Sequence, residues 1–103
     1  MKLLVVLSVS ETTKDVKRIL INHKVPVYSE VDMEGFRVKP PLADKTNWFA
    51  QGKYGVFSKL FFTFCEENNV SDVLKAITDF NQQHENSKQY PLHAFQLNVE
   101  KTA

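Results

Sequence analysis

Residues 55–67, GVFSKLFFTFCEE, constrain the fold most strongly because they read as a strand that is apolar on both faces. Neighbouring side chains of a strand point to opposite sides of the sheet. The segment therefore divides into two apolar rows, one of Val56, Leu60, Phe62 and Phe64, the other of Phe57, Phe61 and Cys65. Such a strand belongs in the middle of a sheet that is covered on both sides.

The composition indicates one small domain, because 103 residues hold a single core. A net charge of +1 gives no electrostatic case for a nucleic acid or an anionic membrane as partner. The single cysteine, Cys65, excludes an intrachain disulfide and suits a reducing compartment. No apolar run has the length of about twenty residues that a transmembrane helix needs, and the N-terminal run lacks a signal-peptide cleavage site. We expect a cytoplasmic protein.

Hydrophobic periodicity predicts two helices between four strands. The expected strands are 2–9, 25–34, 55–67 and 92–100, of which the second and fourth alternate apolar and polar residues. The helices are expected to begin at Thr12 and Ser71 as caps and to end near Asn22 and His84. Their apolar stripes are Val16, Ile19, Leu20 and His23 in the first, and Val73, Leu74, Ile77 and Phe80 in the second.

The order β-α-β-β-α-β is that of the ferredoxin-like sandwich, an α+β fold with an antiparallel sheet and both helices on one face. Its first and third strands are central, which agrees with their apolar character. The opposite face stays open and exposes one of the two rows of 55–67. Each large apolar side chain left in water forgoes about 1.5–3 kcal/mol, and a contiguous patch of them exceeds what a monomer tolerates. We therefore expect an obligate homo-oligomer with closed symmetry.

Two segments of the chain, VYSEVDMEGFR at 27–37 and HAFQLNVEKT at 93–102, resemble parts of the nitrogen-regulatory PII-like proteins. VYSEVDMEGFR at 27–37, followed by a long loop at about 37–54, resembles their second strand and the start of their long loop. HAFQLNVEKT at 93–102 resembles their last strand, and the order of elements agrees over nearly the whole chain. The resemblance implies a homotrimer with the sheets around a central axis, a small-molecule effector in the clefts between subunits, and a loop that contacts a target protein.

The chain also departs from that family. Its classical members carry a glycine-rich loop before the last strand, whose amides cradle nucleotide phosphates. Here HENSKQYPLH at 84–93 contains no glycine, and GKYGV at 52–56 is only a faint echo of the family's tyrosine modification motif. The chain thus resembles a divergent member, or a cousin nearer the CutA-like divalent-ion tolerance proteins of the same trimeric fold. Both a nucleotide and a divalent metal stay open as cofactors.

The loop at about 37–54 carries the candidate ligand site. An exposed Trp-Phe pair makes a good binding anchor, and cations beside an aromatic ring suit an anionic, planar ligand. The candidate ligand-binding residues are Arg37, Lys39, Trp48, Phe49, Lys53 and Tyr54, joined by Lys88 from the connection before the last strand. The alternative for Trp48 and Phe49 is packing against the domain itself or a neighbouring subunit, and for Lys88 a solvated surface position.

No pattern for catalysis is present in the sequence. It contains no nucleophile motif, Walker loop or dinucleotide fingerprint, and the histidines His23, His84 and His93 and Cys65 lack the spacing of a zinc site. We predict a non-catalytic PII-like regulatory protein that binds a small anionic effector or a partner protein through the loop. The alternatives are a CutA-like metal-binding protein and a small oligomeric enzyme, which would need an enclosed pocket with a perturbed acid or base.

Overall fold

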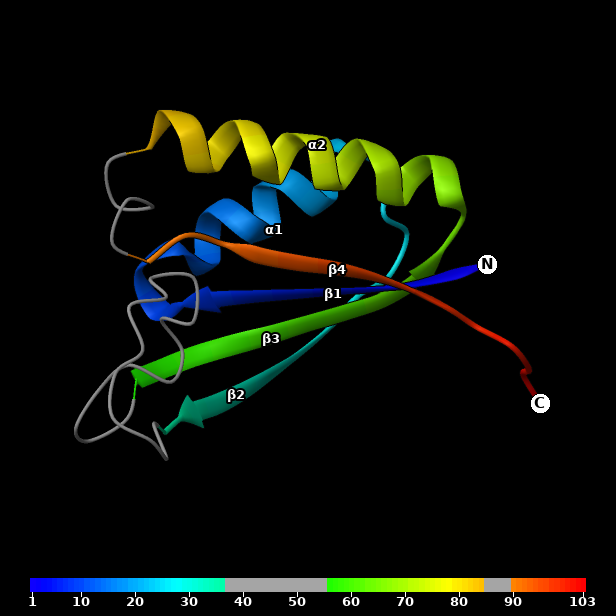
Figure 1. The fold of residues 1–103 in the computed structure, drawn as a ribbon, viewed down its shortest axis with the longest axis horizontal. Helices are drawn as coiled ribbons and strands as arrows, with labels where there is room; N and C mark the ends of the chain where they lie inside the picture. The colour runs from blue at the N-terminus through cyan, green and yellow to red at the C-terminus, as the bar shows by residue number, and fades with distance from the viewer. Residues whose placement is uncertain (37–55, 85–89) are drawn as a thin grey trace.

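The computed structural model describes residues 1–36, 56–84 and 90–103. Its elements follow one another as β1 (Lys2–Val9), the 3-10 turn η1 (Ser10–Thr12), α1 (Thr13–Asn22), β2 (Ser29–Gly35), β3 (Val56–Cys65), α2 (Glu67–Gln83) and β4 (His93–Asn98). The four strands form one antiparallel sheet in the order β2-β3-β1-β4. Both helices lie on one side of this sheet (Figure 1). The expected ferredoxin-like βαββαβ fold is confirmed, with β1 and β3 in the middle.

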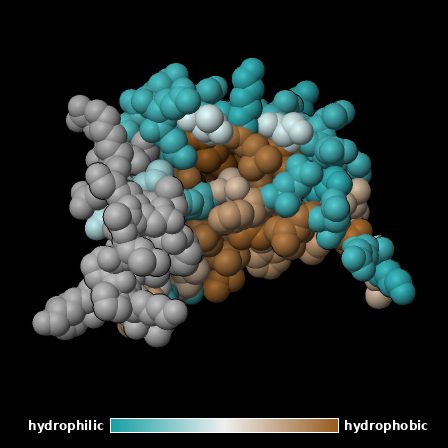
Figure 2. Space-filling model, viewed as in Figure 1, coloured by the Kyte–Doolittle hydropathy of each residue, from teal (hydrophilic) through white to brown (hydrophobic). Residues whose placement is uncertain are grey.

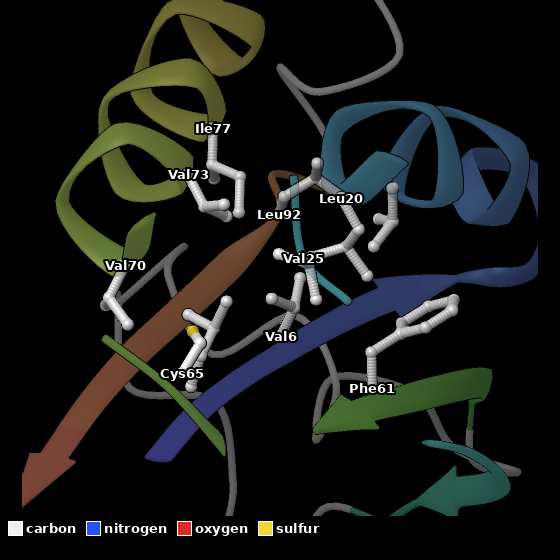
Figure 3. Packing of buried hydrophobic residues seen from close by; sticks show 11 residues of the cluster. Val6, Leu20, Val25, Phe61, Cys65, Val70, Val73, Ile77 and Leu92 are labelled. Atoms are coloured by element: carbon white, nitrogen blue, oxygen red, sulfur yellow. The ribbon is translucent and has the colours of Figure 1, made fainter. Parts of the chain in front are cut away.

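The core lies between the helices and the sheet. Phe61 of β3 is 1% exposed and is paired with Val6 of β1, which is also 1% exposed. Side chains from both helices and from the central strands converge there (Figure 3). The buried members are Leu4, Val6, Val16, Leu20, Val25, Phe61, Cys65, Val70, Val73, Ile77 and Leu92. This convergence accounts for the apolar stripes of both helices, since each stripe faces the sheet.

The opposite face of the sheet, which we call the open face, has no helix over it. Register and strand alternation place Phe62 beside Val5, and Phe64 beside Leu3, on this face. Of its aromatic side chains, Phe64 is 52% and Phe95 48% exposed. The apolar residues of the open face are Leu3, Val5, Leu7, Val9, Val31, Met33, Leu60, Phe62, Phe64, Phe95 and Leu97. In Figure 2 hydrophobic residues gather over the strands, whereas hydrophilic residues cover α2.

The prediction for the second strand was wrong at its start, because β2 begins at Ser29 and not at residue 25. Helix α1 ends in a Schellman motif, in which Val25 N–H donates to Leu20 C=O at 3.1 Å and Lys24 N–H to Ile21 C=O at 3.2 Å. Lys24 has φ 60° at the turn, and Val25 then enters the core. The next residues carry the chain from the helix layer to the sheet edge, so Val25 and Val27 do not share one strand face.

Of the two predicted helix caps, Thr12 is confirmed in position and Ser71 was wrong. Thr12 is the N-cap residue of α1, but its side chain makes no capping bond, and its Oγ1 donates instead to the C=O of Val9, the last residue of β1, at 3.2 Å. Helix α2 begins at Glu67, after an extended Glu66 at the cap, so Ser71 lies within the helix. The start of α2 depends on where the chain leaves the preceding strand. Strand β3 ends at Cys65, so the helix begins almost at once.

Candidate functional site

Four strand ends meet at one end of the sheet, and both segments that carry the predicted site leave from there. Val9 of β1 is paired with Ser58 of β3, Gly35 of β2 is paired with Val56, and Leu7 of β1 with His93 at the start of β4. We call this the loop end of the sheet. Residues 36 and 56, which flank the long loop, therefore lie at the same end of the molecule as the start of β4 (Figure 1).

A second, smaller apolar cluster lies on the open face at the loop end. Leu7 and Val9 are buried, and Leu60, Met33 and Tyr90 pack against them. Tyr90 is the first described residue after the connection that contains Lys88. The chain that carries Lys88 thus returns to the sheet beside the strand ends between which the long loop runs.

The predicted ligand-binding residues themselves lie outside the described part of the chain. They are Arg37, Lys39, Trp48, Phe49, Lys53, Tyr54 and Lys88. The structure fixes the positions of the residues that flank them, namely Phe36, Val56, His84 and Tyr90. Their grouping into one site, and the alternative in which Trp48 and Phe49 only pack, stay predictions.

Two residues at the loop end were missed by the sequence analysis. Phe36 follows β2 directly and is 58% exposed, so an aromatic ring stands beside Arg37 in the sequence. Ser58 is 3% exposed, and no polar atom of the described residues lies within hydrogen-bond distance of its Oγ. A buried hydroxyl without a partner costs about 1–3 kcal/mol. The signal that could have found Ser58 is a polar residue within the apolar row of β3.

Ion pairs connect β2, which leads to the loop end, to the neighbouring elements α1 and β3. Lys17 of α1 contacts Glu30 of β2 at 3.3 Å, and Lys59 of β3 contacts both Glu30 at 3.6 Å and Asp32 at 3.4 Å. The hydrogen bond to the Asp32 carboxylate is the main reason why the pKa of Lys59 lies above its usual value. These contacts connect α1, β2 and β3 on the helix side of the sheet.

Two of the three histidines, His23 and His84, have local contacts that suit structural roles. His23 Nδ1 donates to Ile19 C=O at 2.9 Å, and the ring of His84 stacks on Phe80 with 4.1 Å between centroids. Within residues 1–36, 56–84 and 90–103, no three His, Cys, Asp or Glu side chains are grouped so that they could hold a metal ion. Nothing in this part of the chain therefore favours the metal-binding alternative.

Cys65 is a core residue, as its interpretation as a small hydrophobe predicts. It is 6% exposed and packs in the main core between the sheet and α2. Burial raises the pKa of its thiol, which keeps the sulfur protonated. A protonated, buried thiol is a poor nucleophile, so Cys65 does not support the enzyme alternative.

Comparisons with known proteins place the fold. No protein-family model matches the chain, and no curated protein matches it. Among solved structures, the apo form of CPII from Thiomonas intermedia K12, a nitrogen regulatory PII-like protein, is similar with a TM-score of 0.66 and 12% identity, over 95% of this chain and 87% of that one. A PII-like signalling protein of Thermus thermophilus is similar with a TM-score of 0.62 and 16% identity, over 95% of this chain and 84% of that one.

A further structure shows CPII bound to ADP, AMP and bicarbonate. It matches with a TM-score of 0.59 and 14% identity, over 99% of this chain and 94% of that one. The expected resemblance to PII-like proteins is confirmed at the level of the fold. None of the described helices is long and apolar enough to cross a membrane.

Proposed function

We propose that this protein is a non-catalytic, PII-like regulatory protein that binds a small anionic effector at the loop end of the sheet. The observation that carries the proposal is the meeting of four strand ends at the point where the long loop leaves and the connection with Lys88 returns. Ligands of α/β and α+β folds commonly bind where several loops meet at the end of a sheet.

The residue types of the two connections suit an anionic, planar effector. The loop supplies cations and the Trp48–Phe49 pair, and Phe36 adds an exposed ring at its base. CPII, which has the same fold, binds ADP, AMP and bicarbonate. In this chain the connection before β4 has no glycine, so Lys88 and the loop lysines would contact a phosphate in place of backbone amides.

Assembly as a homotrimer is the second part of the proposal. The open face holds apolar side chains from all four strands, and no described residue on it is an Asp, Glu, Lys or Arg. A patch of this size is expected to be covered in solution. The fold resembles that of PII-like proteins, and a trimer with its sheets around a central axis is what that resemblance implies.

Ligand binding is tested by thermal shift with ADP, AMP, bicarbonate, Cu²⁺ and Zn²⁺, each added separately. A ligand at a hundred times its Kd stabilises by about 2.7 kcal/mol, which raises Tm by several degrees. We expect a shift with a nucleotide or bicarbonate that Trp48→Ala weakens without changing the assembly. Lys14→Ala on the exposed side of α1 is the control. A shift with metal alone, or none with any anion, would contradict the effector proposal, and loss of assembly in Trp48→Ala would favour its packing role.

A further inference from the structure

A hollow lies at the outer edge of the sheet, where β3 extends beyond the start of β2. The β2–β3 register ends at the pair Ser29 and Phe62, so Thr63 to Cys65 have no β2 residue beside them. Thr63 Oγ1 donates to Val27 C=O and holds the crossing chain near this edge. The hollow has a volume of about 210 Å³ and is lined by Val27, Tyr28, Ser29, Phe62, Thr63 and Phe64. We call it the edge hollow.

The edge hollow opens sideways, because its lining comes from both faces of the sheet. Phe62 and Phe64 belong to the open face, whereas Thr63 alternates to the helix side. All six lining residues are uncharged, and Val27 at its rim is 73% exposed. Three of the six, Val27, Phe62 and Phe64, are apolar, so a complementary surface should be uncharged and largely apolar and should approach from beside β2.

Protruding apolar side chains lie at the other edge of the same sheet. Phe95 and Leu97 of β4 are 48% and 47% exposed and share the open face with Phe62. After β4 the chain continues through residues 99–103 without further pairing and leaves the body of the domain (Figure 1). Figure 2 shows the same tail standing away from the rest of the surface.

Within one copy, the protruding side chains of Phe95 and Leu97 cannot reach the edge hollow. Strands β1 and β3 lie between the two edges, and three strand spacings separate them by about 14 Å. Because the hollow opens sideways, the copy that fills it stands beside β2 and still has its own β2 edge free for the next copy. Such head-to-tail contacts generate a ring when the rotation closes.

We propose that Phe95, Leu97 and the tail 99–103 of one copy dock at the edge hollow of the next copy in a closed ring. This inference rests on the proposed homotrimer and names the residues that join its subunits. The charge pattern favours a second copy as occupant, since neither the lining of the hollow nor Phe95 and Leu97 carries a charge that would select a nucleic acid, a lipid headgroup or a charged peptide. The two charges of the tail, Glu100 and Lys101, are of opposite sign and cancel.

The test uses two variants that each damage one side of the contact. Val27→Arg puts a charge at the rim of the hollow, and the double variant Phe95→Ser/Leu97→Ser removes the protrusions; both change exposed side chains. Sedimentation at micromolar concentration should give a trimer for the wild type and monomers for each variant. Each lost apolar contact should raise the dissociation constant about tenfold or more. Ile21→Arg, exposed on α1, is the matched control and should remain a trimer.

Mixing the two variants in equal amounts gives the decisive result. The intact protrusions of Val27→Arg can dock only in the intact hollow of the double variant, so we expect mixed dimers. Absence of these dimers, or variants that remain trimers while far-UV circular dichroism shows them folded, would overturn the edge contact and leave the trimer standing. A wild-type monomer or two-fold dimer would overturn the ring together with the trimer. Removal of residues 99–103 should weaken the wild-type trimer, and an unchanged trimer would exclude the tail from the contact.

Discussion

Phe61 and Phe62 are neighbours in β3 but lie on opposite faces of the sheet. Phe61 is buried under the helices beside Val6, whereas Phe62 lies on the open face beside Val5. This relation settles which row of the doubly apolar strand forms the core. The row with Phe61 and Cys65 is the core row, and the row with Leu60, Phe62 and Phe64 is the one that needs another cover.

Substitution by glutamate should therefore have different effects at these two positions. Phe61→Glu places an unpaired carboxylate in the core and should remove more than about 4 kcal/mol from the free energy of unfolding, enough to unfold much of the protein. Phe62→Glu should leave a folded chain that no longer assembles. Far-UV circular dichroism and sedimentation separate the two results. A folded Phe61→Glu, or a trimeric Phe62→Glu, would contradict the assignment of faces.

The thiol of Cys65 should react slowly with Ellman's reagent in the native protein and at once in denaturant, since it is buried. Its pKa is raised above 9.0 by burial, so the folded state favours the neutral thiol. Stability from this group is complete below the unfolded pKa and is lost as the pH rises through the folded one. Cys65→Ala should cost about 1–2 kcal/mol at pH 7, and this difference should shrink above pH 9. Fast native labelling at pH 8 would contradict the buried position.

Lys59 is expected to anchor β2 through its contacts with Glu30 and Asp32. Lys59→Met should lower Tm more than Lys14→Met on the exposed side of α1. Since its carboxylate partners raise the pKa of Lys59, the stabilisation is present below pH 10.5 and fades at higher pH. Thermal melts at low salt and at about 1 M salt measure the effect, because about 1 M salt screens the attraction between exposed charges. Equal melts of the two variants at low salt would show that the network contributes nothing.

Lys24 has φ 60°, a left-handed conformation that favours glycine, at the end of α1. Lys24→Gly should therefore stabilise the protein by up to about 1 kcal/mol, whereas Lys24→Ala should not. Urea unfolding of the three proteins measures the difference. A loss of stability in Lys24→Gly would mean that the side chain itself contributes more than the backbone strain costs.

The order of elements could be predicted because it depends on periodicity, which the sequence shows directly. The choice between Phe61 and Phe62 could not be predicted in the same way, because both rows of β3 are apolar and the helices could cover either. The ends of the elements were missed where backbone geometry decides them. At Lys24 a residue other than glycine adopts a left-handed turn, and α2 begins at Glu67, well before Ser71, because β3 ends at Cys65.

The candidate site was predicted from residue types, and the structure adds the place where its segments meet. Arg37 to Tyr54 and Lys88 are far apart in the sequence, and only the register of β1 with β3 and β4 brings their flanking residues to one end. Ser58 interrupts the apolar row of β3, which is a signal, but a single serine in a strand does not show whether its side chain is buried, and it was therefore missed. Its burial follows from the packing of Leu7, Val9 and Leu60 around the loop end.

Ser58→Ala tests whether the buried hydroxyl is kept for binding. No described polar atom is within hydrogen-bond distance of Ser58 Oγ, so its removal should relieve a desolvation cost and leave Tm unchanged or slightly higher. If the hydroxyl donates to the effector, the same variant should bind that effector more weakly, by about 1 kcal/mol or fivefold. Melts of the free and the ADP-saturated protein give both values, and Thr63→Ser serves as a conservative control in the same strand. A Tm that falls by several degrees without ligand would show that Ser58 has a partner in residues 37–55 and a structural role.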